Sequence, residues 1–279
     1  MKKRLISGII HRLPQNSMSR TMGKIMATRF SRLAIRHYIR MYNIDLSQVE
    51  KPVHEYRSLK DFFIRRLKPG ARPIDADKKV IVSPVDGTVS QLGDIHEGTL
   101  IQAKGKNYKV SELLGNDPDT AKRFVGGSFI TIYLSPRDYH RIHAPVEGTL
   151  TKYSYLPGRL YPVNQMGVEN VESLFARNER LITFIRNEQL GCVAVIKVGA
   201  LFVGSVKVAY NRATTNVRGG RQITEEILGT PQVSKGDELG WFEFGSTVIL
   251  LFEKDQIEWT AQVREGATLR MGQKLAVQK

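Results

Sequence analysis

The amino-acid sequence predicts an α+β fold in which basic amphipathic helices precede a larger domain of mostly antiparallel strands. Two observations predict it. Residues 1–72 contain 17 of the 42 lysines and arginines but only 4 of the 27 acidic residues, so they carry +13 of the formal net charge of +15. After residue 80, short apolar runs alternate with glycine and proline, as in antiparallel sheets joined by turns. We therefore predict a basic helical region over 1–72 and a second domain over 73–279.

The basic region carries the pattern of an amphipathic helix, which is clearest near residues 19–42. Its positive residues recur at intervals of three to five, which places them along one side of a helix: Arg20, Lys24, Arg29, Arg32, Arg36 and Arg40. Apolar residues supply much of the opposite side: Met22, Ile25, Met26, Phe30, Leu33 and Ile39. Such a helix can lie in the interface of an anionic membrane. The alternative is an ordinary helix packed on its own domain with its arginines facing water. Nucleic acid is not expected as a partner, because no recognised binding motif is present.

A second, shorter helix is predicted after residue 58. Residues 58–61, Ser-Leu-Lys-Asp, resemble a capping box with aspartate in the reciprocating position, and the apolar residues that follow extend the helix to Leu67. Helical turns are expected around Ser111–Leu114 and Asp119–Phe124. Two buried strands are expected over Val193–Val208, joined through glycines.

Two pairs of repeated motifs divide the second domain. Residues 83–90, Ser-Pro-Val-Asp-Gly-Thr-Val-Ser, are echoed by residues 144–151, Ala-Pro-Val-Glu-Gly-Thr-Leu-Thr, and residues 233–239 are echoed by 263–269. Such repeats predict related β-hairpin units that face each other, similar to the hammerhead halves of lipoyl- and biotinyl-carrier domains. A carrier domain needs a lysine at the tip of a hairpin, but an acidic residue follows each Pro-Val. A carrier role is therefore not expected.

Composition excludes several classes of protein. No run approaches the roughly 20 apolar residues of a membrane-spanning helix. The apolar stretch from Leu5 to Ile10 is too short for a signal-peptide core. The single cysteine, Cys192, rules out an internal disulfide, and we interpret it as a core residue in a reducing compartment.

The chemistry centres on Gly245-Ser246-Thr247, a polar trio inside the apolar, strand-like run at 240–253. Glycine leaves its own carbonyl sterically open, and the Ser246 hydroxyl follows one bond away. Such a serine can attack the preceding carbonyl and convert the amide to an ester, provided that the bond is strained and a base and oxyanion donors are at hand. On these three residues alone, a small-residue bulge in a buried strand is the simpler interpretation.

Three further residues could activate this serine or act beside it. Asp86 lies in the turn-like motif Pro84-Val85-Asp86-Gly87, and His140 and His143 lie three residues apart. A carboxylate can orient an imidazole that takes the serine proton. The aspartate could instead cap a turn, and the histidines could be ordinary core or surface residues. No metal site is expected, because the sequence around the histidines favours strand or loop and offers no third ligand.

These motifs, together with Lys235-Gly-Asp-Glu-Leu-Gly240, resemble the phosphatidylserine decarboxylase family from about residue 55 to the C-terminus. The family usually has leucine where this chain has Phe244. The resemblance implies a self-processing enzyme whose cofactor is a pyruvoyl group made from Ser246. It implies cleavage of the Gly245–Ser246 bond, with His143 as the base oriented by Asp86 and His140 acting on the bound substrate. It also places Arg159, Tyr161 and Asn164 near the headgroup pocket.

The resemblance further implies phosphatidylserine as substrate, phosphatidylethanolamine as product, and a heterodimer of chains 1–245 and 246–279. With the basic region it implies peripheral attachment to the cytoplasmic face of a bacterial inner membrane. Self-cleavage is expected to need nothing before residue 80. There are two alternatives: a membrane-associated serine hydrolase that uses Asp86, His143 and Ser246 on an external ester, or a non-enzymatic basic adaptor. Only the decarboxylase predicts permanent cleavage of the chain.

Overall fold

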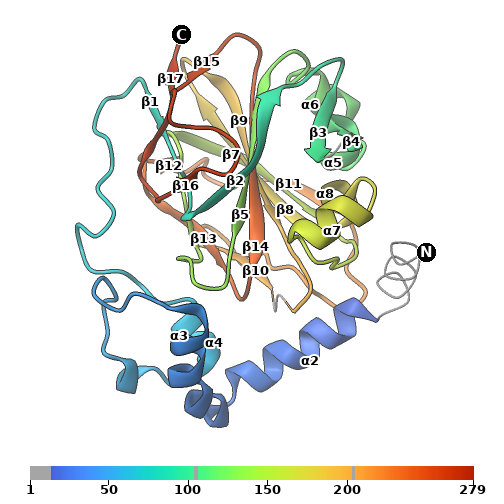
Figure 1. Ribbon diagram of the computed structural model, residues 1–279. Coiled ribbons are helices and arrows are strands. Elements are labelled where there is room, and N and C mark those ends of the chain that lie inside the picture. Colours follow the sequence, from blue (N-terminus) through green and yellow to red (C-terminus); the bar gives the residue numbers. More distant parts are fainter. Residues whose placement is uncertain (1–13, 104–105, 203–204) are drawn as a thin grey trace.

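The computed structural model describes residues 14–103, 106–202 and 205–279 (Figure 1). The helices are α2 (Gln15–Ala27), η1 (Arg29–Ala34), α3 (Ile35–Tyr42), η2 (Val53–Glu55), α4 (Leu59–Phe63), α5 (Val110–Leu113), α6 (Pro118–Lys122), α7 (Gln165–Asn170) and α8 (Leu174–Arg177). The strands are β1 (Val80–Val82), β2 (Gly87–Asp94), β3 (Thr99–Ala103), β4 (Lys106–Lys109), β5 (Ser128–Leu134), β6 (Arg141–His143), β7 (Gly148–Leu156), β8 (Arg180–Asn187), β9 (Gly191–Val198), β10 (Val206–Val208), β11 (Ile223–Glu226), β12 (Gln232–Val233), β13 (Glu238–Phe242), β14 (Ser246–Phe252), β15 (Ile257–Trp259), β16 (Thr268–Leu269) and β17 (Lys274–Gln278).

A nine-stranded antiparallel sheet forms the centre of the molecule, in the order β11-β7-β8-β9-β14-β5-β2-β16 with β12 beside β7. The remaining strands form three smaller sheets: β1-β17-β15, β10-β13-β6 and the pair β3-β4. This confirms a strand-rich α+β fold. In Figure 1 the blue helices α2, α3 and α4 lie beneath one end of the large sheet.

Strand β14 lies in the middle of this sheet, and all seven of its residues are buried. Its side chains alternate between two apolar clusters: Val248 and Leu250 belong to one, Ile249 and Leu251 to the other. A strand covered on both faces is expected to be apolar throughout. Ser246 and Thr247 are therefore polar exceptions in a position that packing alone would fill with apolar residues.

The repeated motifs open two matching strands. Gly87 begins β2 and Gly148 begins β7, toward opposite ends of the large sheet. A Cβ atom at either position would lie 2.5 Å from a carbonyl oxygen of a neighbouring strand, that of Tyr133 or Arg186. Both positions therefore require glycine. Whether these units are hammerhead halves stays a prediction.

The prediction of one continuous helix near residues 19–42 is wrong, because the helix is interrupted. Helix α2 ends at Ala27, Thr28 is extended, and the 3₁₀ helix η1 follows. The Thr28 hydroxyl donates to the Ile25 carbonyl at 2.6 Å, and Ser31 Oγ donates to Thr28 O at 2.7 Å. These side chains compete with the backbone ladder and so favour the break. The start of the predicted region, residues 1–13, lies outside the described residues.

The break also moves two apolar residues to the surface. Phe30 and Leu33 are 86% and 82% exposed. They line a shallow depression with Arg29, Arg32 and Arg36, instead of lying opposite the arginines as expected.

The second predicted helix is confirmed as α4, although it ends at Phe63 rather than Leu67. The Ser58 hydroxyl accepts from Asp61 N at 3.1 Å, as a cap should. The short helices α5 and α6 and the strands β9 and β10 also agree with the sequence prediction.

The helical region shares a core with the sheet. Ile35, Phe62 and Phe63 belong to the same apolar cluster as Phe129 and Ile249. The domain boundary near residue 72 stays a prediction, but the two regions pack as one body at this interface. Among the described residues, no helix is long and apolar enough to cross a membrane.

Candidate active site

The Gly245–Ser246 bond lies where the chain enters β14. The Ser246 hydroxyl is fully buried, and its oxygen has no hydrogen-bond partner among the described residues. Phe244, two residues before it, has a φ angle of +143°, a conformation that a residue with a side chain rarely adopts. A backbone outlier of this kind stores on the order of 1–3 kcal/mol. The serine is therefore buried, without a hydrogen-bond partner among the described residues, and next to strained backbone.

Gly245 faces a cavity of about 510 Å³ between the helical region and the sheet. Its walls are mostly apolar and come from the helices and from segments beside the sheet: Met22 and Met26 of α2, Tyr38 and Tyr42 of α3, Phe63 of α4, Tyr133 of β5, Pro136, Pro162, Val163, Met166, Ala200, Leu201, Phe202 and Phe244. A Cβ atom on Gly245 would meet only Leu134 O, at 3.8 Å, so the space around this residue is open. A bulky apolar ligand could therefore reach the bond.

Asp86 is buried and held by an arginine. Arg72 donates to both of its carboxylate oxygens, with Nε to Oδ1 at 2.8 Å, and the Met271 amide donates to Oδ1 at 2.8 Å. Arg72 comes from the end of the basic region. Because a two-pronged contact fixes both oxygens, the Asp86 carboxylate is oriented from outside the β domain.

His143 is oriented by a backbone carbonyl. Its Nδ1 lies 2.7 Å from Gly236 O, and its Nε2 lies 3.1 Å from the Tyr139 hydroxyl. A carbonyl oxygen only accepts, so Nδ1 carries the hydrogen and Nε2 accepts from Tyr139. Burial lowers the pKa of His143 below its usual range, although the Gly236 contact opposes this. The imidazole is thus neutral, with its lone pair on Nε2.

Asp86 and His143 share no hydrogen bond in the described chain; Asp86 acts on the pKa of His143 only as a minor raising charge. The roles predicted for Asp86, His143, His140 and Ser246 stay predictions.

His140 lies in a fully buried aromatic stack. Its ring packs on Phe63 at 4.0 Å between centroids, and Phe63 packs on Phe244 at 4.2 Å. Its Nδ1 donates to Asp138 O at 2.8 Å, and its Nε2 has no partner among the described residues. Burial, and then the charge of Arg65, lower the pKa of His140 to about 3. The stack connects this histidine to the residue that precedes Gly245.

The strained loop is also anchored through Glu243. Lys60 of α4 pairs with its carboxylate at 2.6 Å, Lys207 pairs at 3.4 Å, and Ser205 Oγ donates at 2.7 Å. Charge pairing on both sides restrains the backbone just before Phe244.

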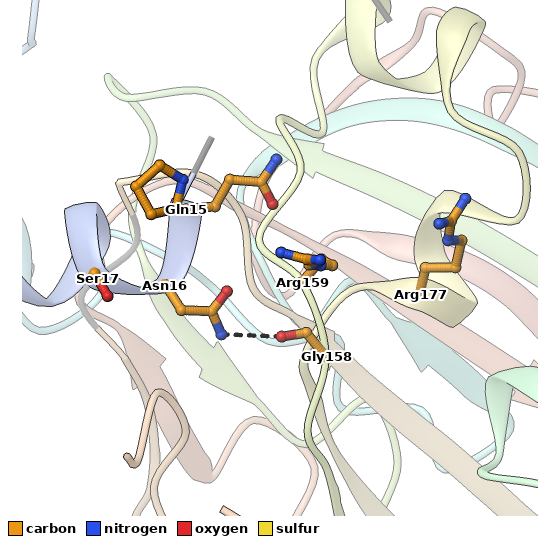
Figure 2. Close-up of a pocket in the computed structure, with 7 residues that line it drawn as sticks. Gln15, Asn16, Ser17, Gly158, Arg159 and Arg177 are labelled. Atoms are coloured by element: carbon orange, nitrogen blue, oxygen red, sulfur yellow. Dashed lines mark hydrogen bonds between the residues drawn. The ribbon is translucent and has the colours of Figure 1, made fainter. Parts of the chain in front are cut away.

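The three headgroup candidates lie apart. Asn164 lines the 510 Å³ cavity and caps α7 through Gly167 N at 3.2 Å. Arg159 lines a different pocket, with Gln15, Asn16 and Arg177, and Figure 2 shows Asn16 reaching Gly158 O there. Tyr161 is buried, and the Arg177 guanidinium lies 5.5 Å from its ring centroid.

Sequence reasoning missed Phe63, Arg65, Arg72 and Tyr139. The run Phe62-Phe63-Ile64-Arg65 could have indicated Arg65, because an arginine that follows an apolar run can be buried, and a buried arginine needs specific partners. In the parts of the chain that the structure describes, no group of three or more His, Cys, Asp or Glu is placed to hold a metal.

The fold and this geometry define a class: a strand-rich protein with a buried serine that has no hydrogen-bond partner among the described residues, next to a residue that lines an apolar cavity and connected to a buried histidine, His140, through Phe63 and Phe244. The family model described as phosphatidylserine decarboxylase matches residues 59–277. The chain is 68% identical over 279 residues to the phosphatidylserine decarboxylase proenzyme of Brevibacillus brevis, covering all of both chains. It is 47% identical over 271 residues to that of Myxococcus xanthus (95% of each chain) and 45% over 273 residues to that of a Shewanella species (95% and 93%). The chain therefore belongs to the phosphatidylserine decarboxylase family.

Proposed function

We propose that this chain is a proenzyme that cuts its own Gly245–Ser246 bond and then decarboxylates phosphatidylserine to phosphatidylethanolamine. The observation that carries the proposal is Ser246, whose buried hydroxyl has no hydrogen-bond partner in the described parts of the chain and lies next to strained backbone and an apolar cavity, in a member of this family. Most buried hydroxyls are hydrogen-bonded, and what separates Ser246 from the other buried hydroxyls without a partner among the described residues, Thr131 and Thr247, is that it follows Gly245 beside the strained Phe244.

In the first stage, His143 Nε2 exchanges the Tyr139 hydroxyl for that of Ser246, with which it shares no hydrogen bond in the described chain, and takes the Ser246 proton as the serine oxygen attacks the Gly245 carbonyl. The Gly245–Ser246 amide breaks and an ester forms. Loss of the Ser246 Cα proton then releases the Gly245 carboxylate, which divides the chain into residues 1–245 and 246–279. Hydrolysis with loss of ammonia leaves a pyruvoyl group at position 246. The two chains remain associated as a heterodimer, because β14 lies between β5 and β9 of the first chain.

The pyruvoyl group, when formed, supplies an electron sink for the carboxylate's bonding electrons. The residues around position 246 fit such a group: Ser246 is buried, the space beside Gly245 is open, and no described residue forms a hydrogen bond with the Ser246 hydroxyl. His140 moves a proton at Nε2 to the carbon that loses CO2. The apolar cavity holds the lipid's hydrophobic part near the headgroup, and Asn164 is our candidate for a headgroup contact.

We propose that the exposed surface formed by η1 and α3 docks on an anionic membrane at the cytoplasmic face of a bacterial inner membrane. Phe30 and Leu33 present apolar side chains among exposed arginines, which suits shallow insertion into anionic lipid. The cavity beside Gly245 is walled by α2 and α3, so docking through these helices would bring it close to the lipid.

The test is denaturing electrophoresis and intact mass of wild type and Ser246→Ala. Wild type should give two chains, the smaller with a blocked N-terminus, and Ser246→Ala should remain one inactive chain. Thr131→Val is the matched control, since it removes another unpaired buried hydroxyl from the neighbouring strand β5 and should still be cleaved. Cleavage of Ser246→Ala would refute the proposed bond. An intact wild-type chain with esterase activity would favour the serine hydrolase.

A further inference from the structure

Arg65 is a buried guanidinium with unused donors. The residue is 4% exposed, two positions after α4. Its Nη2 donates to Arg137 O at 2.7 Å and to Asp138 O at 3.1 Å, whereas Nε and Nη1 have no hydrogen-bond partner among the described residues. Burying a cation without a carboxylate partner is costly, and burial lowers the pKa of Arg65. Packing alone would be served better by an apolar residue.

The carbonyl oxygen of Asp138 connects this arginine to His140. It accepts from Arg65 Nη2 and, at 2.8 Å, from His140 Nδ1. A carbonyl oxygen only accepts, so His140 carries its hydrogen on Nδ1, and Arg65 helps to fix the carbonyl that makes this contact. The guanidinium charge is thereby held close to the imidazole, where it opposes a second proton on Nε2.

We propose that Arg65 is a positioning residue that holds His140 as the neutral, Nδ1-protonated tautomer, with the lone pair of Nε2 available for proton transfer in turnover. This rests on the proposed role of His140 in decarboxylation. In turnover, Nε2 takes a proton as the substrate's amine reacts. The nearby guanidinium makes the resulting imidazolium a strong acid, which gives this proton to the carbon that loses CO2, and the product amine takes its remaining proton from water.

The surroundings of His140 leave Arg65 as the charge that acts on it. Phe63, from α4, covers the ring. Asp138 contributes its backbone carbonyl, while its carboxylate accepts from the amide and hydroxyl of Ser135, each at 2.7 Å. The causes of the lowered pKa of His140 are burial first, then Arg65, with the Asp138 carbonyl opposing. A catalytic histidine paired with a carboxylate would instead have its pKa raised.

The test reads the His140 ring directly in the uncleaved Ser246→Ala protein, so it does not depend on decarboxylase activity. Nitrogen-15 NMR of the histidine rings reports tautomer and pKa. We expect His140 to be Nδ1-protonated and neutral well below pH 6.5 in this background. Adding Arg65→Met should raise the pKa of His140 by about one unit or more and mix its tautomers. Arg65→Lys, which keeps the charge, should retain the low pKa.

Arg57→Met is the matched control, because Arg57 is an exposed arginine of the same segment. It should leave the His140 signals unchanged. If Arg65→Met does not fold, Arg65→Gln decides, since it keeps a donor for the carbonyl but removes the charge. An unchanged tautomer and pKa of His140 in folded Arg65→Met or Arg65→Gln would overturn the proposal. In the processed enzyme, the same variants should lower kcat with little change in KM. They should also move the acid limb of the profile of kcat against pH to higher pH.

Discussion

The arginines of the first 72 residues form two populations that the sequence does not distinguish. Arg29, Arg32, Arg36 and Arg40 are exposed. Arg65 and Arg72 are enclosed, and they hold the carbonyl shared with His140 and the carboxylate of Asp86. The exposed group faces solvent, whereas the enclosed group makes its contacts inside the protein. The exposed arginines therefore contribute to the surface charge and the enclosed ones to internal contacts, and only the contribution of the exposed group is expected to respond to salt.

This comparison bears on one expectation, that self-cleavage needs nothing before residue 80, which stays a prediction. Yet Arg72 holds Asp86, Lys60 pairs with Glu243, and Phe63 packs between His140 and Phe244. Contacts from the helical region therefore reach both histidine-bearing and serine-bearing segments of the site.

The largest difference should appear between Arg72→Leu and Arg40→Leu. Removing one partner of a buried ion pair leaves Asp86 uncompensated and should destabilise the fold by about 3–5 kcal/mol. Losing an exposed arginine should cost under about 0.5 kcal/mol. Urea unfolding in the Ser246→Ala background measures both, and electrophoresis of the otherwise wild-type variants should show slowed cleavage for Arg72→Leu alone. Equal effects would mean that the two populations do not differ.

Replacing Arg29, Arg32, Arg36 and Arg40 together with glutamine should weaken binding to anionic vesicles by up to about 1 kcal/mol per arginine at low salt. Self-cleavage should be unchanged, because these side chains do not reach the site. Co-sedimentation with vesicles measures the binding, and the fourfold lysine variant, which keeps the charge, is the control. Because charge acts over only about 8 Å at physiological salt, raising the salt concentration should reduce the difference in vesicle binding between the wild type and the glutamine variant. Unchanged binding of the glutamine variant would exclude this surface as the contact.

Backbone strain at Phe244 can be separated from ring packing by comparing Phe244→Gly with Phe244→Ala. Both lose the stack on Phe63, but only glycine adopts the observed φ freely. If about 1–3 kcal/mol of strain assists cleavage, the glycine variant should cleave more slowly than the alanine variant. The rate of appearance of the small chain measures this. Faster cleavage of the glycine variant would show that strain does not help.

The last prediction concerns the pH dependence of stability. The pKa of His140 is lowered to about 3 and that of His143 is also lowered, so the unfolded chain binds protons more readily than the folded one. Their contribution to stability is present above the unfolded pKa of about 6.5 and is lost as the pH falls below it. We expect a loss of up to about 1.4 kcal/mol per pH unit for each histidine. Urea midpoints of Ser246→Ala between about pH 7 and pH 5 should show this slope, and adding His140→Gln should reduce it.

The sequence by itself determined the strand-rich fold, the helix capped by Ser58 and the family, since these depend on local patterns and on motifs that keep their order along the chain. It also singled out Ser246, because a hydroxyl in an apolar run departs from the local pattern. The helix break at Thr28 was harder to predict from the sequence, because the surrounding packing decides whether the Thr28 hydroxyl or the helical backbone makes the hydrogen bond.

Only the tertiary structure decided which charges face water and which face the site. Arg65 and Arg40 are equally basic in the sequence, but one points into a core shared by α4 and the sheet and the other does not. The tautomers of His140 and His143 depend on carbonyls of Asp138 and Gly236, and Gly236 lies 93 residues from His143. Burial and long-range hydrogen bonds set the proton affinity of a side chain, and neither can be read from its neighbours along the chain.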